Sequence, residues 1–158
     1  MGDSSFVWKT LGLGAIAGLR SMAAPAALSR AVERGDVDGL ENTPFAALGS
    51  SRVSTVLRVF EIGEMFVDKL SVIVPSRTSP PPLLGRAASG ALVGAALFAS
   101  RGRQTTTGGV LGAVSAVAAA YATERLRLQI SERLGIPDLA VALSEDALVL
   151  FGSARLLR

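Results

Sequence analysis

The sequence predicts an all-α polytopic membrane protein with about five short transmembrane helices in one domain that covers residues 1–158. The first observation is composition: the 158 residues are 49% hydrophobic and only 18% charged, whereas soluble domains carry about 25% charged residues. The second is a positive mean hydropathy of +0.45. The third is that apolar stretches alternate with polar or proline-rich links. In lipid, a helix satisfies all backbone hydrogen bonds within one segment, so each apolar stretch is expected to be helical.

The five apolar stretches are residues 11–28, 53–74, 83–99, 108–123 and 139–157. A helix that crosses a membrane needs about 20 residues, so each stretch is long enough or nearly so. The first contains Arg20 and a Pro25 that kinks it, and the second contains several charges. The third holds only Arg86, the fourth has no charge, and the fifth holds Glu145, Asp146 and Arg155.

The links are read from glycine, proline and polar residues. Residues 33–42 predict an exposed acidic loop, and residues 100–107 a short polar link. Residues 75–82 predict a non-helical loop, because their four prolines remove backbone donors and fix φ. Gly135 is expected to end one helix and Asp138 to begin the next. Residues 124–133 are expected to extend the fourth stretch as an amphipathic, interfacial helix.

Glycines four residues apart occur in three different apolar stretches. In lipid, such small-residue faces allow helix backbones to approach closely. The sequence therefore predicts tight helix packing, within one chain or between protomers. The glycines concerned are Gly14, Gly18, Gly90, Gly94, Gly108 and Gly112.

The second stretch carries three carboxylates, Glu61, Glu64 and Asp68, on one helical stripe. A charge at bilayer depth costs several kcal/mol, so these groups should face protein or water and not lipid. With Glu145 and Asp146 there are five acids in the stretches. The bases available to answer them are Arg20, Arg58, Lys69 and Arg86. A surplus acid favours a proton or cation as any passenger.

Two alternatives remain open for these charges. The stripe can be purely structural, with ion pairs that fix helix register. An enzyme using paired carboxylates is a third reading, but the chain has no His and no Cys and shows no catalytic signature, so none is expected. No metal or cofactor is expected. Nucleic acid is not expected either, because the basic residues are dispersed and there is one Trp and one Tyr.

A weak internal repeat links residues 13–18 (Leu-Gly-Ala-Ile-Ala-Gly) with residues 111–116 (Leu-Gly-Ala-Val-Ser-Ala). It suggests half-repeats 6–74 and 108–158, joined by the proline-rich loop and the helix 83–99. The single helix between them would invert the second half, as in many transporters. Lysines and arginines divide six against six between the two sides, so the positive-inside rule sets no orientation and dual topology is an option.

Several motifs resemble a family of small bacterial membrane proteins known as domain of unknown function 4126 (DUF4126). They lie, in order, at residues 17–21 (Ala-Gly-Leu-Arg-Ser), 64–70 (Glu-Met-Phe-Val-Asp-Lys-Leu), 75–78, 85–92, 133–138 and 142–147. The resemblance implies an integral membrane protein but no activity. It singles out Arg20, Glu64, Asp68, Lys69, Arg77, Arg86, Glu145 and Asp146.

The leading hypothesis is a small channel or transporter for a cation or proton in the cell (plasma or inner) membrane, acting as a homo-oligomer. Glu64 and Asp68 would carry the ion, with Arg20 and Lys69 as counter-charges and the 145–146 pair opposite. The expected pathway residues are Arg20, Glu61, Glu64, Asp68, Lys69, Arg77, Arg86, Glu145 and Asp146. The alternative is a membrane scaffold or assembly subunit with structural ion pairs and no transport of its own.

Overall fold

The computed structural model describes residues 3–67, 78–134 and 138–157. The described part is all-α, as predicted. It contains six α-helices and one short 3-10 turn, η1. Their bounds are α1 Asp3–Leu19, α2 Ala23–Glu33, η1 Ala46–Gly49, α3 Ser51–Val67, α4 Pro80–Ala99, α5 Thr105–Leu134 and α6 Asp138–Leu156.

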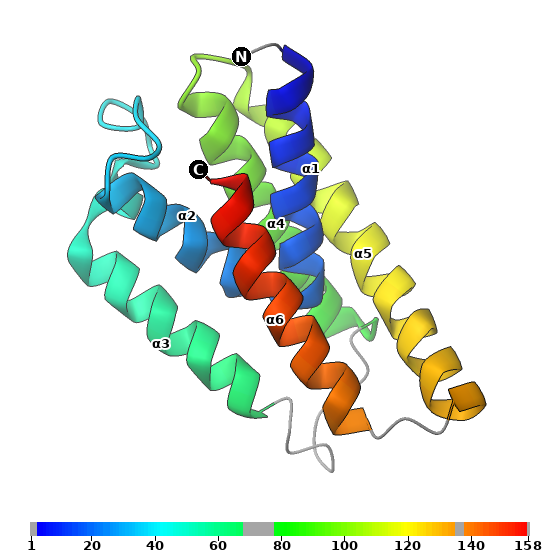
Figure 1. The fold of residues 1–158 in the computed structure, drawn as a ribbon. Coiled ribbons are helices and arrows are strands. Elements are labelled where there is room, and N and C mark those ends of the chain that lie inside the picture. The colour runs from blue at the N-terminus through cyan, green and yellow to red at the C-terminus, as the bar shows by residue number, and fades with distance from the viewer. Residues whose placement is uncertain (1–2, 68–77, 135–137, 158) are drawn as a thin grey trace.

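Three helices, α1, α4 and α5, pack against one another and form the centre of the bundle. Helix α6 lies along α1, and the shorter α2 contacts α1, α4 and α6. Helix α3 packs mainly on α2 and η1 at the side of the molecule (Figure 1). The loop between α2 and η1, the start of α1 and the ends of α4 and α6 gather at one end of the bundle (Figure 1).

The central helices α1 and α5 run in the same direction (Figure 1). Gly14 of α1 lies against Gly112 of α5, and Gly18 lies against Ala116, so the residue numbers rise together. The inverted relation expected between these two stretches is therefore wrong. The reason is an additional chain reversal, because residues 11–28 do not form one helix.

The first stretch is broken after Leu19, where α1 ends, and the chain turns before α2 begins at Ala23. The prediction of one spanning helix here is wrong, although Pro25 marks the place. Proline has no N–H and its ring excludes the carbonyl of the residue four positions earlier, here Ser21. The chain therefore leaves helical geometry at this point instead of merely bending.

The proline-rich link was also predicted too long. Helix α4 begins at Pro80, and prolines occupy its first turn. The first four N–H groups of a helix have no partner within it, so proline loses nothing there. In the remainder of that link, Thr78 and Ser79 are non-helical, as predicted, and residues 75–77 lie outside the described residues.

The other helices agree with the sequence. Residues 108–123 and 124–133 form one continuous helix in α5, and α6 begins at Asp138. The acidic loop follows α2, with Gly35 and Gly39 at φ of 76° and 85°, a backbone region that favours glycine. Helix α3 corresponds to the second stretch up to Val67, and residues 68–74 lie outside the described residues.

The core consists largely of small side chains, mainly alanine with leucine. Many large apolar side chains point outward instead, among them Phe151 at 78% exposed and Trp8 at 70%. In water-soluble proteins, large apolar side chains are most often buried in the core. Two described segments, α4 and Thr105–Ile130 of α5, are long and apolar enough to cross a membrane by length and composition, and the apolar segment Phe6–Leu19 of α1 is shorter.

Candidate functional site

The helix break formed by Arg20, Ser21 and Met22 lies where three other helices meet. Breaking a helix leaves carbonyl groups at the end of the first part and N–H groups at the start of the second without helical partners. In a buried position such groups must be bonded elsewhere, because an unpaired buried backbone group is costly. Side chains of α3, α4 and α6 supply these partners.

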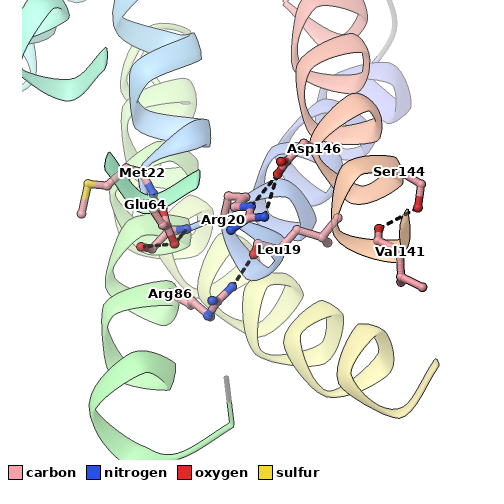
Figure 2. Close-up of polar contacts among 9 residues, drawn as sticks. Leu19, Arg20, Met22, Glu64, Arg86, Val141, Ser144 and Asp146 are labelled. Carbon is pink, nitrogen blue, oxygen red and sulfur yellow. Dashed lines mark hydrogen bonds and ion pairs between the residues drawn. The ribbon is translucent and has the colours of Figure 1, made fainter. Parts of the chain in front are cut away.

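Glu64 of α3 binds the start of α2. One carboxylate oxygen accepts from the N–H of Ser21 at 2.8 Å and from the Ser21 hydroxyl at 2.9 Å. The other accepts from the N–H of Met22 at 2.8 Å. A carboxylate at a helix N-terminus also complements the positive end of the helix dipole. Both oxygens of Glu64 are thus held by fixed donors (Figure 2).

Arg86 of α4 binds the end of α1. It is 6% exposed, and its Nη1 donates to the carbonyl oxygens of Gly18 and Leu19, each at 2.5 Å. A cation at a helix C-terminus complements the negative end of the dipole. Three residues further along α4, the Ser89 hydroxyl donates to the carbonyl of Ser21. That carbonyl is the one that the ring of Pro25 frees.

Arg20 is 1% exposed and forms an ion pair with Asp146 of α6. Its Nε donates to Oδ1 of Asp146 at 3.0 Å, and its Nη2 lies 2.7 Å from the same oxygen (Figure 2). Removing one partner of a buried ion pair typically costs about 3–5 kcal/mol, because the other charge stays buried alone. The pair therefore fixes α6 against the helix break.

Among the described residues, two cations and two anions bind at the helix break: Arg20, Arg86, Glu64 and Asp146. Arg20 and Asp146 form an ion pair, Glu64 binds the N-terminal end of α2, and Arg86 binds the C-terminal end of α1. The partner scheme expected from the sequence is wrong for Glu64: its partners are two N–H groups and a hydroxyl, and Arg20 pairs with Asp146 instead.

Two of the remaining predicted pathway residues, Glu61 and Glu145, lie in the described part of the chain. Glu61 is buried one turn from Glu64, but it pairs with Arg30 of α2 at 3.0 Å, away from the helix break. Glu145, the neighbour of Asp146, is half-buried. Three predicted residues lie outside the described residues: Asp68, Lys69 and Arg77.

The six predicted packing glycines all lie at contacts among α1, α4 and α5. A Cβ on Gly14 would lie 2.7 Å from the carbonyl oxygen of Gly112. Added Cβ atoms on the other five would overlap backbone oxygens still more closely: Gly18, Gly90, Gly94, Gly108 and Gly112. These contacts are within one chain, so the close backbone approach serves the fold of the monomer.

Sequence reasoning missed Ser21, Met22, Ser89 and Arg30 as partners. Ser21 could have been found, because it lies four residues before Pro25 and must lose its helical hydrogen bond. Ser89 and Arg30 carried no comparable signal, since a serine or arginine on a helix has many alternative environments.

Taken together, the geometry defines an α-helical bundle built around a broken helix whose two ends are capped from within. A family model described as Domain of unknown function (DUF4126) matches residues 7–157. The chain belongs to this family. No curated protein and no solved structure matches it.

Proposed function

We propose that the protein is a polytopic membrane protein of the cell (plasma or inner) membrane that acts as a structural or assembly subunit without transport of its own. The observation that carries the proposal is the helix break. Glu64 and Asp146, the described acids there, bind fixed groups of the same chain. An acid that carries ions must exchange its partners, and exchange here would leave the N–H groups at the start of α2 without their acceptor.

Membrane residence is supported by the surface of α5. Of the residues in the 18-residue apolar window within Thr105–Ile130, only 22% are buried, whereas a core helix of a soluble protein buries its apolar stripe. Val110 and Val114 on this helix are each 62% exposed. On α6, Leu148 and Phe151 also point outward. A hydrophobic exterior around a bundle is what a lipid environment requires.

Helix α3 supports the same conclusion because large apolar side chains on it point outward while two polar side chains are buried, although Arg52 and Arg58 are exposed as well. Ser54 and Glu61 are buried at 1% and 3%, while Val59, Phe60 and Phe66 on the outer side are exposed. In water this arrangement would expose apolar surface and bury charge, both unfavourable. In lipid the outward apolar side chains and the inward Glu61 are the favourable arrangement.

Association of copies is part of this proposal. The six packing glycines are used within the chain, so a homo-oligomer would form through the large outward apolar side chains of α3, α5 and α6. In lipid, van der Waals packing of such faces is what drives association.

A second candidate, transport of a proton, is favoured by one observation at Glu61. Its Oε2 binds Arg30, but its Oε1 has no hydrogen-bond partner and is buried. Arg30 is 23% exposed on its side chain, so this pair lies within reach of the surface. An unsatisfied carboxylate oxygen in a membrane protein is a place where a proton can bind.

The deciding experiment has two measurements. Resistance of the protein to alkaline carbonate extraction tests membrane residence. Proton flux into liposomes containing the purified protein, followed with a pH-sensitive dye, tests transport. We expect extraction resistance and flux no greater than in empty liposomes.

Two outcomes would change the conclusion. Flux that is lost in Glu61→Gln but kept in the exposed control Glu41→Gln would favour the second candidate. Flux lost specifically in Glu64→Gln, with the protein still folded, would make the helix break itself a working site and overturn the structural assignment.

A further inference from the structure

A cavity of about 280 Å³ opens at one end of the bundle, away from the helix break. Its lining comes from four places: the start of α1, the loop after α2, and the ends of α4 and α6. Its walls combine apolar side chains, such as Leu97 and Leu156, with the charged residues Lys9, Asp36, Asp38 and Arg101. The cavity is slightly smaller than most small-molecule sites, and its charged side chains offer fixed polar contacts beside an apolar wall.

The walls of the cavity are tightly fixed. The loop residue Gly39 has a φ of 85°, and a Cβ there would lie 2.5 Å from the carbonyl oxygen of Ser100. The next residue, Leu40, is 1% exposed and anchors the loop in the interior. The loop is therefore held against the end of α4, and the cavity between them is part of the fold.

The cavity carries positive charge on one side and negative charge on the other. The cations that line it are Lys9 and Arg101. The guanidinium of Arg101 lies 5.9 Å from the centre of the Phe6 ring, which also lines the cavity. The loop side presents Asp36 and Asp38. Asp36 is engaged by Arg34 at 3.1 Å, so Asp38 is the carboxylate best placed to meet an added cation.

The position of the cavity along the bundle matters as well. The apolar segment of α1 begins at Phe6, and the candidate span of α4 ends at Ala99. The cavity therefore lies at the level where the apolar segments give way to charged residues. In a bilayer this is the depth of the lipid headgroups, just outside a hydrocarbon core about 30 Å thick.

We propose that this cavity binds an ammonium–phosphate zwitterion, and that its source is the headgroup of a phosphatidylethanolamine molecule of the surrounding bilayer. The phosphate would meet the guanidinium of Arg101, since guanidinium groups bind phosphate with charge-assisted hydrogen bonds. The primary ammonium would donate to the carboxylate of Asp38. The glycerol region would lie on the apolar wall of Leu97 and Leu156.

This chemistry distinguishes among common lipids. Phosphatidylglycerol has no ammonium for Asp38. Phosphatidylcholine has a quaternary ammonium that cannot donate a hydrogen bond, and such groups are recognised by aromatic cages instead. The expected order of affinity is therefore phosphatidylethanolamine first, phosphatidylcholine second and phosphatidylglycerol last.

The test is native mass spectrometry of the full chain in detergent with equimolar amounts of the three lipids. We expect phosphatidylethanolamine to be retained about tenfold more than phosphatidylglycerol, a ratio equivalent to about 1.4 kcal/mol. Asp38→Asn and Arg101→Gln should each abolish the preference. The matched control Arg125→Gln, an exposed arginine on α5 far along the helix from its start, should retain it.

A soluble arm identifies the source of the zwitterion. Glycerophosphoethanolamine at the lipid concentration should displace little bound lipid, because it lacks the acyl chains. Equal binding of this soluble compound would overturn the lipid as the source while leaving the zwitterion site. Equal retention of all three lipids, or a preference unchanged in both variants, would overturn the site.

The proposal rests on membrane residence, and the two fail separately. A chain that resists carbonate extraction but shows no headgroup preference overturns only the cavity assignment. A chain that carbonate extracts overturns the membrane proposal and the lipid source together. Asp38 and Arg101 are exposed, so the variants should keep the melting temperature of the parent, which confirms that they fold.

Discussion

Arg20 and Asp146 are separated by 126 residues in the sequence, yet they form an ion pair in the interior of the bundle with a nitrogen–oxygen distance of 2.7 Å. The pair joins the helix break to α6. Because the guanidinium of Arg20 is almost completely buried, its positive charge is stabilised by the carboxylate of Asp146 and by other nearby protein groups, and not by water. The energetics of the fold can therefore be tested by removing the two charges separately and together.

Arg20→Met or Asp146→Leu alone should destabilise the fold by about 3–5 kcal/mol, because each leaves one buried charge without its partner. The double variant should recover most of that loss, since apolar side chains of similar volume often replace a buried pair at little cost. Unfolding in detergent, followed by circular dichroism, measures the three values. Additive losses in the double variant would contradict a direct interaction between the two residues.

Glu64→Ala should destabilise the fold by about 1–3 kcal/mol, because two backbone N–H groups lose their acceptor. Glu64→Gln should cost less, because the amide oxygen still accepts hydrogen bonds on one side. A smaller loss remains, because the NH₂ group on the other side cannot accept a bond from an N–H group. The exposed Glu41→Gln serves as the control and should have little effect. Equal stabilities of the Ala variant and the control would show that the cap is dispensable.

Gly112→Ala should be among the most damaging single-methyl changes in the bundle. The added methyl would overlap the carbonyl oxygen of Gly90, and backbone cannot move as a side chain can, so a loss of about 1–3 kcal/mol or more is expected. Gly85→Ala is the matched control on α4, where a Cβ meets nothing within 4 Å. That change should stabilise the helix slightly, because alanine has the higher helix propensity. Melting temperatures of the two variants should move in opposite directions.

Glu33, at the end of α2, should make stability depend on pH in the acidic range. The hydroxyl of Ser51 at the start of α3 is the main cause that lowers the pKa of Glu33 below 4.5. The folded state thus favours the carboxylate, so its contribution is present above pH 4.5 and is lost as the pH falls through the lowered value. Glu33→Gln should flatten this part of the melting curve against pH. An unchanged acid limb in the variant would assign the dependence to other groups.

The charged residues that meet at the helix break were identifiable from the sequence, because charge within apolar stretches must turn inward. Arg20, Glu64, Arg86 and Asp146 do lie there. The partners of Glu64 and Arg86 were not identifiable, because these side chains bind backbone groups, and every residue has such groups whatever its type.

The expected direction of α5 relative to α1 was wrong for a related reason. Pro25 indicates that the helix is disturbed. Whether the helix only kinks or breaks fully depends on whether other helices can bind the backbone N–H and carbonyl groups that lose their helical partners. Here Glu64, Arg86 and Ser89 do so. That is a property of the whole bundle, so one added turn reversed every later helix relative to the expected topology.

The distribution of these partners along the chain has a consequence for biosynthesis. Arg20 leaves the ribosome first, Glu64 and Arg86 follow, and Asp146 arrives only with α6. Until that last helix has been made, the nascent bundle holds a guanidinium with no carboxylate from α6 to neutralise it. Completion of the chain is therefore coupled to formation of the ion pair that joins α6 to the helix break.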